Sequence, residues 1–337
     1  MNAHHHPQAR RRTLAKAVLL SAIAIATLSG PVTAAAQEWQ PTRPIRLLVP
    51  YGPGGSSDVI ARAMALEMGH ALGQSVVVEN KPGGQGSIAM IEGARAAPDG
   101  YTLVLGHVGT MAVNPAMMPK LQYDVDKDFA PVTLLTRVPM LFAVGPSVNA
   151  KSLDEFISLS KARPGKLNYG SAGNGSAGHL AFEMLKDTAQ VNLTHVPYKG
   201  TGAQMTDLLA GTIDAASAGL PGFLPHVKAG KLRILAVGAA ERLPALPDVP
   251  TVGELGYPGF ESSQWFGLIA PAKTPPQVIE RINKEAQKAL RAASVKRRLE
   301  EDSSTAVGWG PREFTTFITS EKKRWGDVVR SAKLQAD

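Results

Sequence analysis

Two glycine- and serine-rich segments carry the residue types best suited to binding an anion. Residues 50–58 read Pro-Tyr-Gly-Pro-Gly-Gly-Ser-Ser-Asp, and residues 169–179 read Tyr-Gly-Ser-Ala-Gly-Asn-Gly-Ser-Ala-Gly-His. Each segment follows a strand-like apolar run and precedes a helical pattern. Glycine lets a ligand approach the backbone, and the free N–H groups and dipole of a first helical turn attract negative charge. The sequence therefore predicts two anion-binding helix starts.

The first segment also has a purely structural interpretation. Ser56 or Ser57 can cap a helix, which would make the segment an ordinary strand-to-helix turn. Asp58 would repel a bound anion, but Arg62 follows four residues later and can pair with it. We therefore interpret Asp58 as a structural residue, and both interpretations of the glycine segment remain open.

The second segment contains a dinucleotide-type spacing. Gly173, Gly175 and Gly178 match Gly-x-Gly-x-x-Gly, but the acidic residue that should contact a ribose about 20 positions later is missing. Lys199 could instead meet a 2′-phosphate, so binding of NADP stays open as an alternative. We expect that the protein binds no cofactor.

Catalytic and metal-binding patterns are otherwise missing from the sequence. Ser171 and Ser176 each have a glycine two residues later, but Tyr169 and Asn174 stand where a nucleophile elbow needs a second small residue. The chain has no cysteine, which excludes disulfides and thiolate ligands. Its histidines lack the spacing of metal ligands. We expect no enzyme and no metal site, with an exported NADP-dependent oxidoreductase or hydrolase as the alternative.

Further candidate ligand-binding residues lie near these segments or past a strand end. His107 and Thr110 follow an apolar strand, and ligands of open α/β sheets bind at such carboxyl ends. His179 begins the second helical pattern, where it either touches ligand or only orients the loop. Tyr198 and Lys199 lie in a short Pro-Tyr-Lys-Gly segment, and Lys199 is the one cation beside a candidate loop.

Alternating strands and helices must position these loops. Apolar runs at 45–49, 75–79 and 101–106 predict strands, and 58–72 has helical periodicity. The alternation restarts after residue 131, which indicates two α/β halves with parallel sheets and covering helices. Extended runs near 137–146 and 263–271 could carry the chain between the halves. Two such crossings would leave the first domain discontinuous and create a hinge.

The N-terminal 36 residues have the composition of an export signal. A basic stretch, a short apolar run at 17–28 and Ala34-Ala35-Ala36 precede Gln37, the expected mature N-terminus. Arg11-Arg12 also resembles a twin-arginine signal, so both export routes stay open. The segment holds four basic and no acidic residues, half of the formal net charge of +8. The remaining charge does not argue for nucleic acid.

Six segments in order resemble the substrate-binding proteins of tripartite tricarboxylate transporters, the Bug family. The resemblance covers nearly the whole mature chain and is carried by residues 49–62, 79–84, 98–103, 169–180, 196–200 and 229–233. It implies an α/β, two-domain, periplasmic-binding-protein-like clamp, a Venus flytrap with two interdomain crossovers. Combined with the crossings, it predicts domain 1 at 37–140 plus 264–312 and domain 2 at 141–263 plus 313–337.

The resemblance also implies a function and a set of site residues. It implies a periplasmic protein, expected as a monomer, that captures a small mono- or dicarboxylate, aliphatic or aromatic, and delivers it to membrane transporter subunits. A sensor role toward a membrane partner is the alternative. Backbone N–H groups, small hydroxyls and waters, not arginine, hold the carboxylate in that family. This implies contacts from Tyr51, Gly54, Gly55, Ser56, Ser57, Ser171, Ala172, Gly173 and Ser176. Tyr51 departs from the family, which more often has Phe there, and the loop holding His107 is variable in it.

Overall fold

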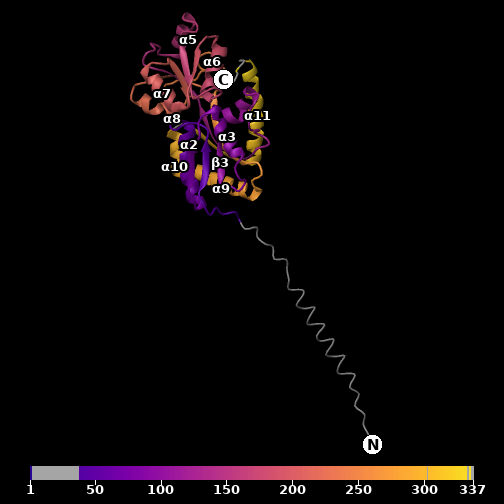
Figure 1. Ribbon diagram of the computed structural model, residues 1–337. Helices are drawn as coiled ribbons and strands as arrows, with labels where there is room; N and C mark the ends of the chain where they lie inside the picture. The colour runs from indigo at the N-terminus through magenta and orange to yellow at the C-terminus, as the bar shows by residue number, and fades with distance from the viewer. Residues whose placement is uncertain (2–37, 302, 332–333, 335–337) are drawn as a thin grey trace. The chain divides into compact units, whose positions relative to one another are not determined.

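Two β-sheets organise the chain in this computed structural model, which describes Met1 and residues 38–301, 303–331 and 334. One sheet has six strands in the order β11-β4-β10-β3-β1-β2, and the other has five in the order β7-β6-β8-β5-β9. We refer to the first sheet with its helices as the first lobe and to the second sheet with its helices as the second lobe (Figure 1). The expected export signal and its cleavage site lie outside the described residues, apart from Met1.

The first lobe combines parallel and antiparallel strands. β1 pairs in parallel with β2 and β3, whereas β10 is antiparallel to β3 and β4, and β11 is antiparallel to β4. The strands are β1 (Ile45–Val49), β2 (Val76–Asn80), β3 (Thr102–His107), β4 (Phe129–Pro139), β10 (Ser263–Pro271) and β11 (Thr305–Trp309). The expected parallel pairing is thus present among β1, β2 and β3, whereas the other three strands of this sheet are antiparallel. β4 leads towards the second lobe and β10 returns from it, so these neighbouring strands run in opposite directions.

Helices of the first lobe cover this sheet, and α2 and α9 pack against each other beside it (Figure 1). They are α2 (Ser56–Leu72), η1 (Gly84–Gly86), α3 (Ser87–Ala94), η2 (Gly109–Val113), α4 (Asn114–Met117), α9 (Pro276–Arg291), α10 (Ala293–Glu301) and α11 (Pro311–Ser331). Helix α2 buries Ile60, Met64, Met68 and Leu72 against the sheet, in agreement with the apolar spacing of its sequence.

The second lobe has parallel strands β6, β7 and β8 and an antiparallel β5 between β8 and β9. Its elements are β5 (Leu141–Val144), α5 (Leu153–Ala162), β6 (Asn168–Ser171), α6 (Ala177–Ala189), β7 (Thr194–Pro197), α7 (Thr201–Ala210), β8 (Ala215–Ala218), α8 (Leu220–Lys228) and β9 (Arg233–Val237). In α5, Ser152 is the N-cap and accepts a hydrogen bond from the Glu155 N–H.

The chain passes between the lobes at two places that lie side by side. Met140 separates β4 from β5, and residues 238–262 connect β9 to β10. Backbone hydrogen bonds join the two passages: Met140 N–H donates to Ser262 O, Ser262 N–H to Gly238 O, and Gly238 N–H to Met140 O. Two crossovers are therefore present, and they form one hydrogen-bonded strap. The first lies within the run expected at 137–146, whereas the second is residues 238–262, because the run expected at 263–271 is β10 of the first lobe.

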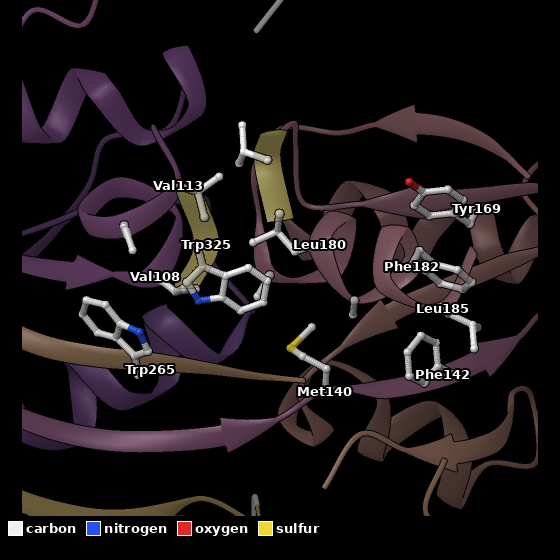
Figure 2. Close-up of a cluster of buried hydrophobic side chains, with 14 of the residues drawn as sticks. Val108, Val113, Met140, Phe142, Tyr169, Leu180, Phe182, Leu185, Trp265 and Trp325 are labelled. Atoms are coloured by element: carbon white, nitrogen blue, oxygen red, sulfur yellow. The ribbon is translucent and has the colours of Figure 1, made fainter. Parts of the chain in front are cut away.

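A buried apolar cluster continues from one lobe to the other. Figure 2 shows Met140 and Leu180 between the indoles of Trp265 and Trp325 on one side and Phe142 with its aromatic neighbours on the other. All five side chains are at most 2% exposed. The cluster gives the lobes a common apolar contact in addition to the covalent crossings.

Helix α11 differs from the expected domain assignment. Residues 313–337 were expected in the second domain, but α11 packs against β4, η2 and α4 of the first lobe. Phe314, Ile318 and Trp325 bury its apolar face there, and the Glu321 carboxylate accepts hydrogen bonds from the indole N–H groups of Trp265 and Trp325 at 2.8 and 2.9 Å. Among the described helices, none combines the length and the apolar character needed to span a bilayer.

Candidate functional site

The first glycine segment positions the start of α2 with backbone geometry alone. Gly54 has a φ of 87°, and Gly55, not a serine, is the N-cap, with no side-chain cap hydrogen bond. The expected capping by Ser56 or Ser57 is therefore wrong, because both residues already belong to the first helical turn. Both are nevertheless buried, at 6% and 5% exposure. Their hydroxyls are consequently free for roles other than capping.

Asp58 serves the architecture of this loop. One carboxylate oxygen accepts a hydrogen bond from the Gly54 N–H at 3.2 Å, and the other lies 2.9 Å from an Arg62 guanidinium nitrogen. Burial raises the pKa of the Asp58 carboxyl, but the hydrogen bonds from Arg62 and Gly54 outweigh it and leave the pKa lowered. Asp58 is thus an ionised structural residue, as its spacing from Arg62 indicates.

The second glycine segment presents the start of α6. Ser176 is the N-cap, and its hydroxyl accepts a hydrogen bond from the His179 N–H at 3.4 Å. The ring of His179 points back into the loop, where Nδ1 accepts a hydrogen bond from the Gly175 N–H at 3.1 Å. Burial lowers the pKa of His179 to about 4, so its imidazole is neutral at physiological pH. His179 therefore orients the loop.

Both helix starts face one cleft between the lobes, with a cavity volume of about 30 Å³. Such a volume holds roughly two water molecules. The lining residues come from the two glycine segments, the end of β3, the crossing at Met140, the start of α7, the β8–α8 turn and the start of β10. They are Tyr51, Gly52, Gly55, Ser56, Ser57, His107, Met140, Ala172, Ser176, Ala177, Gly178, Thr201, Ser217, Ala218, Gly219, Gln264 and Phe266.

Glycines allow the lobes to approach closely around this cleft. A Cβ atom added to Gly219 would lie 2.6 Å from Ser56 Oγ, and one added to Gly109 would lie 2.9 Å from the Gly175 carbonyl oxygen. Both distances are below van der Waals contact, and each pair joins the two lobes. The glycines thus permit a closed arrangement that larger residues would obstruct.

A chain of buried polar groups lines the first-lobe wall of the cleft. His107 Nδ1 accepts a hydrogen bond from the Gly109 N–H at 3.0 Å and lies 3.1 Å from the Tyr51 hydroxyl. His107 Nε2 lies 3.2 Å from Gln264 Oε1, and Gln264 Nε2 donates to Ser56 Oγ at 3.0 Å. Burial lowers the pKa of His107 to about 4, although the hydrogen bond to Gln264 opposes this shift.

The second-lobe wall contributes a hydroxyl without a partner among the described residues. Ser217 lies on β8 and is 2% exposed, and its Oγ makes no hydrogen bond to any of them. A buried hydroxyl without a hydrogen bond is unfavourable by about 1–3 kcal/mol. Since Ser217 lines the cleft, a polar group bound there would satisfy it.

Half of the candidate residues inferred from the sequence line the cleft, and the other half do not. The lining candidates are Tyr51, Gly55, Ser56, Ser57, His107, Ala172 and Ser176; the others are Gly54, Thr110, Ser171, Gly173, His179, Tyr198 and Lys199. Thr110 exchanges hydrogen bonds with the backbone of His107, and the Tyr198 hydroxyl donates to Asp207. Lys199 is exposed, so the one candidate cation does not line the cleft.

Ser171 makes a contact that resembles a nucleophile and its base. Its Oγ lies 2.7 Å from His195 Nε2. The same oxygen donates to the Gly173 carbonyl at 3.0 Å and accepts from the Gly173 N–H at 3.2 Å. Ser171 is fully buried and does not line the cleft. The pair therefore holds the loop in shape and cannot reach a substrate in this arrangement.

Sequence reasoning missed three polar side chains of the lining, those of Thr201, Ser217 and Gln264. Gln264 lies on β10, in the run at 263–271 that the sequence analysis interprets only as extended chain, and Ser217 lies on β8. The available signal is that successive side chains of a strand point to opposite faces of the sheet. In the described part of the chain, no cluster of His, Asp and Glu has the arrangement of a metal site.

Residues 60–334 match a family model described as tripartite tricarboxylate transporter family receptor. Among known relatives, protein BugT of Bordetella pertussis is 38% identical over 316 residues, covering 93% of this chain and 96% of BugT. Two solved structures are similar at 36% identity. Rpa4515 of R. palustris with adipate has a TM-score of 0.85 and covers 88% of this chain and 99% of that one. MatC from Rhodopseudomonas palustris with bound malate has a TM-score of 0.82 and covers 86% and 99%.

Proposed function

We propose, from the premise that the chain belongs to the tripartite tricarboxylate transporter receptor family, that it is a periplasmic solute-binding protein for a small carboxylate. The family is one of substrate-binding receptors and not of enzymes. The protein would be exported by its N-terminal signal, would capture the carboxylate between its two lobes, and would deliver it to membrane subunits of a tripartite transporter.

The observation that carries this proposal is the convergence of two helix N-termini on one cleft. The first turns of α2 and α6 both line it, through Ser56 and Ser57 on one side and Ala177 and Gly178 on the other. Each helix start offers N–H groups and the positive end of a helix dipole. Neither lysine nor arginine is among the described residues that line the cleft. An anion held there would be recognised by backbone dipoles and hydroxyls, which suits a carboxylate.

Two facing helix starts favour a ligand with a polar group at each end. A dicarboxylate could place one carboxylate against α2 and the other against α6, with the unpartnered Ser217 hydroxyl as a further donor. The malate and adipate bound by the two similar structures have this form. We propose a dicarboxylate as the preferred ligand class.

Ligand entry requires the lobes to separate. The cavity of about 30 Å³ is too small for a dicarboxylate, which has several times the size of the two waters that would fill it. The hydrogen-bonded strap of Met140, Gly238 and Ser262 is the natural hinge, because within residues 38–301 and 303–331 the chain passes between the two sheets only there. We therefore propose that residues on either side of this strap move as two domains.

The test is isothermal titration calorimetry of the purified protein with a panel of mono- and dicarboxylates that includes malate and adipate. We expect saturable binding of at least one acid, and ligand recovered chemically unchanged after long incubation. A binder at 100 times its Kd should stabilise the fold by about 2.7 kcal/mol. The proposal is wrong if no acid binds, and the absence of catalysis is wrong if a bound acid, an added ester or NADP is converted.

A further inference from the structure

The His107 ring is oriented by a backbone amide. The Gly109 N–H donates to His107 Nδ1 at 3.0 Å, and a backbone amide can only donate. Nδ1 must therefore carry the lone pair. A proton on Nδ1 would point at the Gly109 hydrogen, which excludes both the other tautomer and the cation in this position. The buried Tyr51 hydroxyl, 3.1 Å from the same nitrogen, is compatible because it can donate as well.

The proton of a neutral His107 then resides on Nε2 and fixes the next link. Nε2 lies 3.2 Å from Gln264 Oε1, so the imidazole donates and the amide oxygen accepts. The amide nitrogen of Gln264 is consequently directed away from the ring. It donates to Ser56 Oγ at 3.0 Å. The Gly109 N–H thus sets the direction of both following hydrogen bonds, from His107 on β3 to Gln264 on β10 and from Gln264 to Ser56 on α2.

The relay ends on the Ser56 hydroxyl. Ser56 Oγ accepts a hydrogen bond from Gln264 and so keeps its own proton, and one lone pair, for a group in the cleft. With the Gln264 amide turned round, Ser56 would instead donate that proton to Gln264. Ser56 lines the cleft in the first turn of α2, where the helix N–H groups are donors too. This end of the cleft therefore offers the Ser56 proton and the helix N–H groups as donors, against a single Ser56 lone pair as acceptor. Carboxylate oxygens can accept from all of these donors, whereas the NH₂ group of a carboxamide has only that lone pair to meet.

We propose that His107 and Gln264 are positioning residues that hold Ser56 as a hydrogen-bond donor and thereby make the cleft select a carboxylate over the matching carboxamide. The proposal rests on the proposed function, because it concerns the carboxylate expected at the start of α2. It assigns selectivity to a hydrogen-bond relay behind the binding surface, since His107 and Gln264 act through Ser56.

The relay can be tested first without any ligand. In protein labelled with ¹⁵N-histidine, the ring nitrogen shifts of His107 report its tautomer, and the signal is assigned by its loss in His107→Gln. We expect the neutral Nε2–H form at pH 7. A proton on Nδ1, or a cationic ring at pH 7, would overturn the relay.

Selectivity is then measured by calorimetry with adipate, malate and the mono-amide of each. In Gln264→Met, which keeps the side-chain length, no amide donor holds the Ser56 proton towards the cleft. The hydroxyl can then turn its proton away, so the preference for acid over mono-amide should fall about tenfold. Gln287→Met is the matched control, because Gln287 donates to the Gly308 carbonyl away from the cleft. Its preference should equal that of the unaltered protein.

Coupling to Ser56 separates a relay from general damage to the site. Ser56→Ala should lower the preference for the acid by itself, and Gln264→Met added to Ser56→Ala should change it little further. Bound acids with an unchanged preference in Gln264→Met would overturn the relay while leaving the proposed function intact. If the unaltered protein binds neither adipate nor malate, the proposed function fails for these acids and the selectivity proposal fails with it.

Discussion

Replacing Gly219 by alanine should hinder closure of the cleft without harming either lobe. Gly219 precedes α8 with φ −69° and ψ 158°, a conformation open to any residue. The added methyl group would, however, lie 2.6 Å from Ser56 Oγ, 2.7 Å from Val138 Cγ1 and 2.9 Å from Gln264 Nε2. All three atoms belong to the first lobe, whereas Gly219 belongs to the second, so the strain arises only when the lobes meet.

The size of the effect follows from these contacts. Carbon atoms pack at about 3.5–4.0 Å, so the lobes would have to separate locally by about 1 Å. Forcing a methyl group into a packed site typically costs about 1–3 kcal/mol. If ligand binding requires closure, affinity should fall roughly 5- to 150-fold, since each 1.4 kcal/mol is tenfold. The unfolding free energy of the separated lobes should stay unchanged or rise slightly, because alanine restricts the unfolded chain more than glycine does.

Calorimetric affinity and small-angle X-ray scattering of Gly219→Ala and Gly253→Ala provide the assay. Gly253 is a matched control, because an added Cβ would lie at an ordinary 3.6 Å from Thr251 Oγ1. We expect weaker binding and a larger radius of gyration at saturating ligand for Gly219→Ala alone. Unchanged affinity and radius in Gly219→Ala would refute the idea that this contact belongs to the binding-competent state.

Three further changes test the charge recognition, the buried histidines and the docking of α11. Ser176→Asp should keep the α6 cap but lower carboxylate affinity more than a hundredfold, because the added charge competes with the ligand for the same N–H groups. Lys199→Ala should have little effect on the affinity. Calorimetry showing the reverse would contradict recognition by helix termini. The pKa values of His107 and His179 are about 4 in the folded protein and 6.5 unfolded, so the unfolded chain binds more protons between these pH values. The contribution of each neutral histidine to the free energy of unfolding should thus be full above pH 6.5 and be lost as the pH falls towards 4. The loss is on the order of 3 kcal/mol per histidine. It should be seen as a lower urea midpoint at pH 4.5 than at pH 7. Glu321→Gln should lower stability by about 1–3 kcal/mol, because its carboxylate accepts two buried indole hydrogen bonds; an unchanged melting temperature would argue against this contact.

Local patterns made much of each lobe predictable. The strand at 45–49 coincides with β1, and the helix expected over 58–72 is α2 with one additional half-turn at its start. Glycine punctuation and apolar periodicity determine such elements from neighbouring residues alone. The same patterns placed both glycine segments at helix starts, which the structure brings together at one cleft.

The features that could not be predicted from the sequence depend on contacts between distant segments of the chain. The antiparallel neighbours of β10 and the first-lobe position of α11 depend on which strands lie adjacent, and an amphipathic helix carries no record of the surface it covers. Gln264 was missed for the same reason. Its side chain reaches the cleft because β10 pairs with β4 in one register, and a shift by one residue would turn it to the opposite face. The capping residue of α2 was misassigned because Gly55 and Ser56 are both acceptable caps, and only backbone geometry decides between them.

The tryptophans are confined to one half of the molecule, which makes their emission a selective reporter. All four, Trp39, Trp265, Trp309 and Trp325, belong to the first lobe or to the segment leading into it, and Trp265 follows Gln264 directly. Fluorescence during denaturation would therefore follow the first lobe, while far-ultraviolet circular dichroism follows both. Coincident curves would mean that the shared apolar cluster makes the lobes unfold as one cooperative unit. A loss of dichroism at constant emission would mean that the second lobe unfolds first.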